Sequence, residues 1–170
     1  MSNAMISDIT VLKPKMAPQV FIPYVLAAAR ATQAACGIPA SFTIAQAAVE
    51  SDWDGSGLSQ QDFNFFGIKA IGGWRGAVAT WPTREFLQGH GVMVEAPFRK
   101  YASLEEGFED HARFLTENER YRTAFDHKDD SIAFARAVQA AGYATDPHYA
   151  DAIVAVIGEH GLKQFDLAPA

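Results

Sequence analysis

The chain has 170 residues, and its 14 Lys and Arg against 20 Asp and Glu give a formal net charge of −6. Hydrophobic residues make up 49% of it, so a folded single domain is expected and global disorder is not. A duplex-DNA-binding protein usually carries a basic surface, so nucleic acid is not the expected partner. The sequence contains no run of about 20 apolar residues, so no membrane span is predicted. The single cysteine, Cys36, excludes an intrachain disulfide.

The N-terminal segment is expected to lie outside the folded domain. Ser2-Asn3-Ala4 before Met5 has the composition of an expression-tag remnant, so Met5 is the expected native start. No signal peptide is visible after Met5, which indicates either a non-classical export route or a leader that has been removed. We therefore expect a tag remnant and an extended arm over residues 1–17, and one domain over residues 18–165.

Helix signals dominate the first part of this domain. The alanine-rich segment 18–36 ends at Gly37, a residue typical of a helix C-terminus. Ser41 is placed to cap a second helix over about residues 42–51. Segment 52–76 mixes Gly, Asp, Asn and Gln with aromatic residues, which predicts irregular backbone.

The middle of the chain predicts a β-hairpin followed by a helix. Segments 77–86 and 92–100 have strand-like composition, and the glycine-containing loop 88–91 between them permits a tight reversal. The capping box at residues 103–106, Ser-Leu-Glu-Glu, then opens a third helix.

Two more helices are expected at the C-terminal end. Asp130 or Ser131 can cap a fourth helix, which stops at Gly142. Asp146-Pro147 is typical of a helix start, and this last helix ends near Gly161. The predicted fold class is therefore α+β and mostly α, with one small hairpin.

Glu50 is the first candidate for chemistry. It ends an apolar helix, and Gln46 precedes it by one turn on the same face. A carboxyl group at the rim of an apolar pocket has its pKa raised, as a general acid requires near neutral pH. The alternative is that Glu50 is only the first solvated residue after a buried helix.

Two further groups could face the same cleft. Glu85 shares a strand face with Thr83, and a carboxylate on a hairpin folded over the helices could approach Glu50. Enzymes that hydrolyse glycosidic bonds usually use a pair of carboxylates. The alternative is that Glu85 is only a solvated glutamate on a strand. The Tyr143 hydroxyl could also face Glu50 or could bind backbone instead.

Aromatic residues offer platforms for sugar rings. Trp53, Trp74 and Trp81 are candidates for a groove wall, whereas most of the phenylalanines around Phe66 are expected in the core. Asn64 lies among phenylalanines, so it could hold a turn or orient a substrate amide. The histidines lack zinc-ligand spacing, and a calcium loop beginning at Asp52 lacks its glutamate, so no metal or other cofactor is expected.

Four stretches of the sequence carry a resemblance to a known family. They are residues 45–53 (AQAAVESDW), 64–69 (NFFGIK), 83–86 (TREF) with 98–101 (FRKY), and 142–150 (GYATDPHYA). In this order and spacing they resemble glycoside hydrolase family 73, the bacterial endo-β-N-acetylglucosaminidases of flagellar rod proteins and autolysins. The resemblance covers about residues 20–162.

The resemblance implies a lysozyme-like helical domain with a hairpin lobe over an active-site groove. It implies hydrolysis of the bond from N-acetylglucosamine to N-acetylmuramic acid in peptidoglycan, with Glu50 as general acid. Glu85 matches a carboxylate whose role varies, and Tyr143 matches a tyrosine that could orient the acetamido group of the substrate. We expect further substrate contacts from Gln46, Trp53, Asn64, Phe66, Trp81 and Thr83.

Alternatives and biological setting stay open at this point. A muramidase or lytic transglycosylase would cut the other linkage, and a non-catalytic wall-binding module would keep only the fold. The expected site of action is the periplasm or cell wall, with peptidoglycan strands as partner and a monomer as the working form. A phage lysin, an autolysin domain, or a bacteriolytic toxin with a dedicated immunity protein would each fit.

Overall fold

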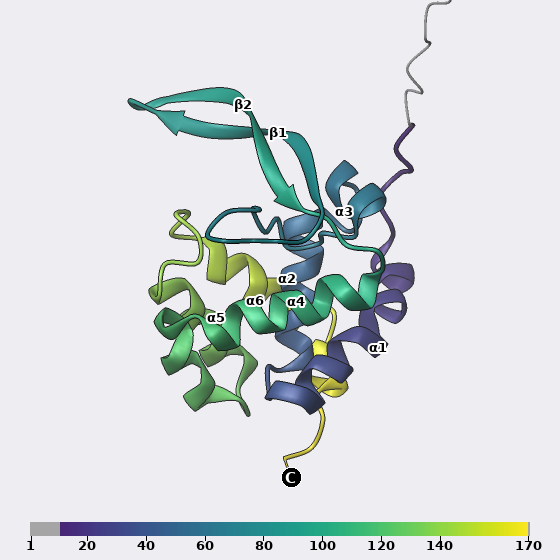
Figure 1. The fold of residues 1–170 in the computed structure, drawn as a ribbon. Coiled ribbons are helices and arrows are strands. Elements are labelled where there is room, and N and C mark those ends of the chain that lie inside the picture. The colour runs from purple at the N-terminus through teal and green to yellow at the C-terminus, as the bar shows by residue number, and fades with distance from the viewer. Residues whose placement is uncertain (1–10, 170) are drawn as a thin grey trace, which may run out of the picture.

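The computed structural model describes residues 11–169, apart from the side chain of Phe86. The tag remnant and the start at Met5 lie outside the described residues. The elements, in chain order, are α1 (Pro18–Cys36), α2 (Ala40–Ser51), α3 (Gly57–Asp62), β1 (Val78–Leu87), β2 (His90–Arg99), α4 (Leu104–Glu117), the 3₁₀ helix η1 (Glu119–His127), α5 (Ser131–Ala140), α6 (Tyr149–Glu159) and the 3₁₀ helix η2 (Leu162–Phe165). This arrangement is mostly helical with one hairpin, as predicted (Figure 1).

Helix α2 is the centre of the helical body, and it packs against α1, α5, α6 and η2. Its residues 40–48 are all buried, because alanines let the neighbouring helices approach closely. The predicted Ser41 cap is wrong. The helix begins at Ala40 after Pro39, and the Ser41 amide and hydroxyl both donate to the Asp166 carboxylate at 2.7 Å. A carboxylate from the C-terminal segment therefore satisfies the start of α2.

The backbone reverses immediately after α2. Asp52, Trp53 and Asp54 follow in the left-handed region, with φ of 49°, 56° and 61°. Hydrogen bonds hold this costly conformation, among them Trp53 N–H to Ala48 O at 2.8 Å and Asp54 N–H to Ser51 Oγ at 2.9 Å. The short helix α3 follows, and it was not predicted within the irregular segment.

Strands β1 and β2 form an antiparallel hairpin that projects from one end of the helical body (Figure 1). The turn is tighter than predicted, because only Gln88 and Gly89 lie between the strands, with φ of 51° and 80°. Positive φ at both positions matches the twist of the flanking strands. At its base the hairpin is joined to the preceding loop by Arg99 N–H to Ile68 O at 2.9 Å.

Side-chain caps position the remaining helices. Ser103 caps α4, and Asp130 caps α5, as predicted. Helix α6 begins at Tyr149, two residues after the predicted proline position. The Asp146 carboxylate instead accepts from His148 N–H at 2.8 Å, so it closes the turn before the helix.

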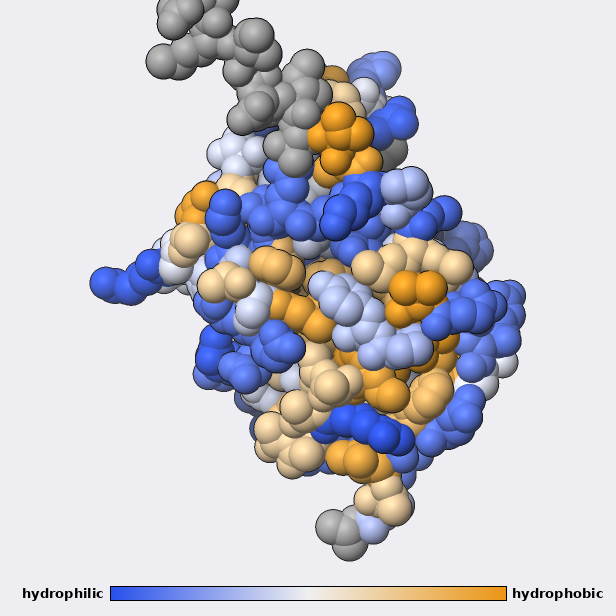
Figure 2. Space-filling model, turned by 90° about the vertical axis from the view of Figure 1, so that its right-hand side faces the viewer, coloured by the Kyte–Doolittle hydropathy of each residue, from blue (hydrophilic) through white to orange (hydrophobic). Residues whose placement is uncertain are grey.

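The surface around this core is mixed. Figure 2 shows hydrophobic and hydrophilic residues interleaved over the face that carries α1, where Val20 and Tyr24 are among the exposed apolar residues. Over the part of the chain that the structure describes, no helix combines the length and apolar character needed to cross a membrane.

Candidate active site

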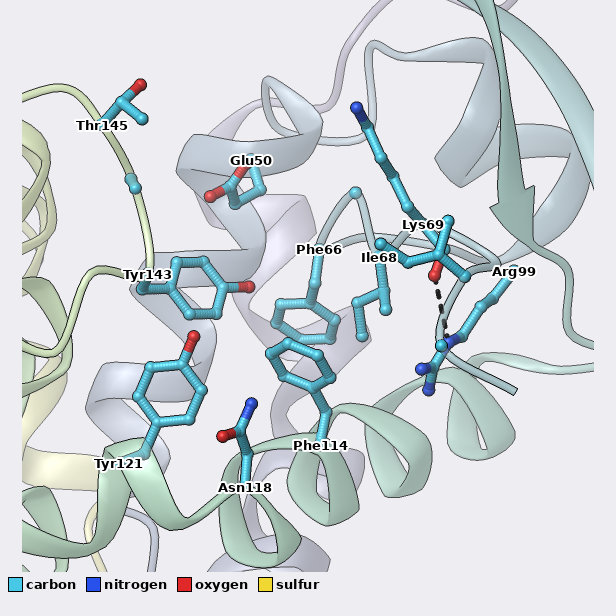
Figure 3. A pocket seen from close by; sticks show the side chains of 14 residues that line it. Glu50, Phe66, Ile68, Lys69, Arg99, Phe114, Asn118, Tyr121, Tyr143 and Thr145 are labelled. Atoms are coloured by element: carbon cyan, nitrogen blue, oxygen red, sulfur yellow. Dashed lines mark hydrogen bonds between the residues drawn. The ribbon is translucent and has the colours of Figure 1, made fainter. Parts of the chain in front are cut away.

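A cavity of about 660 Å³ opens beside the C-terminal end of α2, and we call it the main cavity. Figure 3 shows Glu50 on one wall, with the Tyr143 hydroxyl pointing into the space and Phe114 and Asn118 on the opposite side. The complete lining comprises Glu50, Phe66, Gly67, Ile68, Lys69, Ile71, Gly72, Arg99, Phe114, Asn118, Tyr121, Tyr143, Ala144 and Thr145. It is a mixture of aromatic rings and a few polar groups, as sugar binding requires.

A second, smaller cavity of about 260 Å³ lies on the other side of Glu50, and we call it the side cavity. Its lining includes Trp81 and Phe98 from the hairpin, and it shares Glu50 and Gly67 with the main cavity. Gly67 has φ of 64°, and a β-carbon there would lie 3.9 Å from Glu50 Oε2. Glu50 therefore stands between two spaces, each of which can hold part of a chain-like substrate.

Glu50 has the environment of a proton donor. Burial at the rim of the core raises the pKa of its carboxyl group above the ordinary value of 4.5. A hydrogen bond from the Tyr149 hydroxyl lowers the same pKa, but this effect is smaller than that of burial. The balance holds the proton more firmly than on a solvated glutamate, as general acid catalysis requires.

The Tyr149 hydroxyl is itself positioned by a hydrogen bond from Gln46. Gln46 Nε2 donates to the Tyr149 oxygen at 2.7 Å, so the tyrosine proton is left for Glu50. Gln46 is completely buried and lines neither cavity. Its place is therefore behind Tyr149, away from both cavity surfaces, whereas we expected it to contact substrate.

Tyr143 shares the main cavity with Glu50. Its ring stacks on Tyr149 at 5.6 Å between centroids and meets Tyr121 at 5.9 Å. Burial and the nearby Glu50 carboxylate raise the pKa of Tyr143 well above its ordinary value. The hydroxyl therefore stays protonated and can donate a hydrogen bond to a substrate.

Glu85 lies on β1 and contributes to the lining of neither cavity around Glu50. Its Oε1 accepts from Lys69 Nζ, and both side chains are more than a third exposed. Lys69 itself lines the main cavity. Lys69 thus joins Glu85 to the edge of the main cavity, and neither cavity is lined by both carboxylates.

Two of the predicted substrate residues lie at the side cavity. Trp81 packs against Gly57 so closely that a β-carbon there would lie 2.4 Å from the indole ring, and Trp81 Nε1 donates to Asp62 Oδ2 at 2.6 Å. Asn64 is buried, and its amide nitrogen donates to Ile68 O at 2.9 Å and to Arg99 O at 2.8 Å. Asn64 therefore holds the loop to the hairpin and has no free amide donor for a substrate.

The other predicted contacts divide between core and surface. Phe66 lines the main cavity but is buried, because it lies flat on His111 at 3.7 Å. Trp53 packs edge-on against Phe21 at 5.3 Å and lines neither cavity. Thr83 on β1 also lines neither cavity.

Several residues around Glu50 were missed from the sequence. Tyr149 carried a signal, since it follows Asp146-Pro147 at a helix start, but nothing local connects it to Glu50. The end of α4 and the start of η1 contribute Phe114, Asn118 and Tyr121 to the main cavity. In the sequence these three residues have no feature that distinguishes them from other helix residues. Only the packing of α4 against α1, and of η1 against α5, brings them to the site.

Comparison with known families shows to which family the chain belongs. A glucosaminidase family profile, described as mannosyl-glycoprotein endo-beta-N-acetylglucosaminidase, matches residues 26–162. The chain belongs to this family. The resemblance to glycoside hydrolase family 73 is therefore confirmed, and with it membership of a class of glycoside hydrolases.

The chain is also similar to individual curated proteins. The chain is 38% identical over 143 residues to peptidoglycan hydrolase FlgJ of Vibrio parahaemolyticus, covering 82% of this chain and 46% of that protein. It is 37% identical over 131 residues to exo-glucosaminidase LytG of Bacillus subtilis, covering 74% of this chain and 45% of LytG. The chain thus spans less than half the length of these curated relatives.

A solved structure supports the fold in the same way. The catalytic domain of the autolysin Auto from Listeria monocytogenes superposes with a TM-score of 0.77 at 29% identity, covering 92% of each chain. The lysozyme-like fold class is therefore confirmed.

Proposed function

We propose that this glucosaminidase-family chain is an endo-β-N-acetylglucosaminidase that hydrolyses the bond from N-acetylglucosamine to N-acetylmuramic acid in peptidoglycan. The observation that carries the proposal is the position of Glu50, a carboxyl group of raised pKa between two cavities. Sugar units on either side of the scissile bond would occupy the two cavities. Space on both sides of Glu50 favours cutting within a strand over trimming from its end.

In this proposal Glu50 protonates the oxygen of the leaving sugar as the glycosidic bond breaks. Tyr149 orients the carboxyl group, and Gln46 holds Tyr149. Tyr143 donates to the acetamido group of the sugar in the main cavity. After the first step, the Glu50 carboxylate takes a proton from the incoming water.

The proposed mechanism also needs a nucleophile for its first step. Glu85 is bound to Lys69 and lies off both cavity linings, which is not the placement of an enzyme nucleophile. We therefore favour attack by the carbonyl oxygen of the acetamido group on its own anomeric carbon, giving a cyclic intermediate that water opens. Glu85 then serves to hold Lys69 and the hairpin beside the groove.

The proposed function also implies where the protein acts. A peptidoglycan hydrolase acts in the periplasm or cell wall, and the open groove around Glu50 suits a monomer on a long polymer. If the protein is a bacteriolytic toxin, a dedicated immunity protein would bind over the groove. Co-purification of a groove-binding protein that blocks digestion would identify that case.

Product analysis tests the proposed bond. Purified peptidoglycan is digested with the wild type and with Glu50→Gln, reduced with borohydride and analysed by mass spectrometry. We expect fragments that end in reduced N-acetylglucosamine from the wild type and none from the variant. Reduced or anhydro muramic acid at the ends would contradict the proposal and indicate a muramidase or a lytic transglycosylase instead.

A further inference from the structure

A third cavity, of about 360 Å³, continues from the main cavity along the C-terminal half of α4. We call it the charged cavity. It shares Arg99, Phe114 and Asn118 with the main cavity, and these three residues border the main cavity in Figure 3. Its lining is completed by Asp110, Arg113, Glu117 and Glu119. A ligand in the main cavity can therefore extend a branch into the charged cavity.

The inner end of the charged cavity is already neutralised. Arg99 Nη1 donates to Asp110 Oδ2 at 2.9 Å, and both side chains are largely buried. The Arg99 guanidinium also lies over the Trp74 ring, 4.5 Å from its centre, which is a further favourable contact. The charges of this inner pair are therefore already matched by each other, and a ligand charge is not needed there.

The outer end carries charges of both signs that remain accessible. The Arg113 side chain is 57% exposed and meets Asp110 Oδ1 at 3.3 Å, which occupies only one of its donors. Glu117 is exposed, and among the described residues it has no ion pair. Because Arg113 and Glu117 are four residues apart on α4, they lie on the same helix face.

This charge pattern does not match the sugars of the proposed substrate. The sugars of a peptidoglycan strand are uncharged, and the charges reside in the peptide attached to each muramic acid. That peptide carries carboxylates and, on its diamino acid, an ammonium group. An arginine and a glutamate at the open end of a side pocket are complementary to such a zwitterionic chain.

We propose that the charged cavity binds the stem peptide of the muramic acid unit, with Arg113 for a peptide carboxylate and Glu117 for the diamino acid ammonium. The inference rests on the proposed function, since it requires a glycan strand in the main cavity. It makes Arg113 and Glu117 specificity residues that read the peptide and take no part in the chemistry. The enzyme then prefers strands that still carry their peptides.

Paired substrates test this inference. Glycan strands bearing their stem peptides are compared with the same strands after an amidase has removed the peptides. The value of kcat/KM is measured on both for wild type, Arg113→Glu and Glu117→Lys. The matched control is Arg136→Glu, since Arg136 is an equally exposed arginine, on α5, that pairs with Asp151. Thermal unfolding of each variant establishes that it is folded.

We expect Arg113→Glu and Glu117→Lys each to lower kcat/KM about tenfold on peptide-bearing strands. On peptide-free strands both variants should match the wild type, and Arg136→Glu should match it on both substrates. Equal losses on the two substrates, or no loss on either, would overturn the peptide site while leaving the glucosaminidase proposal intact. A wild type that cuts neither substrate would overturn the proposed function and this inference with it.

Discussion

Replacing Tyr149 by Phe removes the hydroxyl that donates to Glu50 and leaves the ring in place. A hydrogen bond to a charged group contributes about 1.5–3 kcal/mol, and about 1.4 kcal/mol corresponds to one pKa unit. Because this bond stabilises the ionised carboxylate, its loss should raise the pKa of Glu50 further above its ordinary value.

The pH dependence of kcat/KM measures this shift. A general acid must be protonated, so ionisation of Glu50 sets the basic limb of the profile. We expect Tyr149→Phe to move that limb to higher pH. The unpaired Gln46 donor should also cost about 2 kcal/mol of folding stability, which lowers the Tm by about 4–8 °C.

Tyr121→Phe is the matched control, because it removes the same atom from another wall of the main cavity. Tyr121 is not among the groups that shift the pKa of Glu50, so its loss should leave the basic limb in place. The reasoning is refuted if Tyr149→Phe leaves the limb unmoved, moves it downward, or shifts it no more than Tyr121→Phe does.

Three further predictions follow from contacts around the groove. Burial raises the pKa of Glu50, so the folded state binds this proton more tightly than the unfolded state does. The resulting contribution to folding stability is complete below the ordinary pKa of 4.5 and is lost as the pH rises through the raised pKa. Glu50→Gln should therefore have a higher Tm than the wild type at pH 7 and nearly the same Tm at pH 4; a lower Tm at pH 7 would contradict this. Asn64→Ala removes three buried hydrogen bonds, including the one to Arg99 O, and should lower the Tm by about 6–12 °C, whereas a change below about 2 °C would show that the loop holds without them. Lys69→Met breaks the partly exposed pair with Glu85, so it should change the Tm by less than about 2 °C while lowering kcat/KM on glycan strands, and unchanged kinetics would argue against a role for this pair.

Local sequence signals predicted most of the fold. Ser103 and Asp130 cap the helices that they were expected to cap, because these caps depend on residues two or three positions away. The tight hairpin likewise follows from glycine between two strand-like segments. Helix α3 was missed because its six residues are too short to show periodicity.

The contacts that were missed join residues far apart in the chain. Ser41 binds Asp166 across 125 positions, and Gln46 binds Tyr149 across 103. Both residues were assigned from their neighbours, Ser41 as a helix cap and Gln46 as a substrate contact, and tertiary packing gave them other partners. The position of Glu50 at the end of a buried helix was predictable, whereas the tyrosine that orients it was not.

The central claim is that Glu50 supplies the proton to the leaving sugar, and leaving-group dependence tests it most directly. The wild type and Glu50→Gln are compared on a natural glycan and on the same glycan with dinitrophenolate, which departs without protonation, in place of the leaving sugar. We expect the variant to lose about 10²–10⁴-fold in kcat/KM on the natural glycan, and to lose far less on the dinitrophenyl substrate. Equal losses on both substrates would contradict the assignment of Glu50 as the general acid.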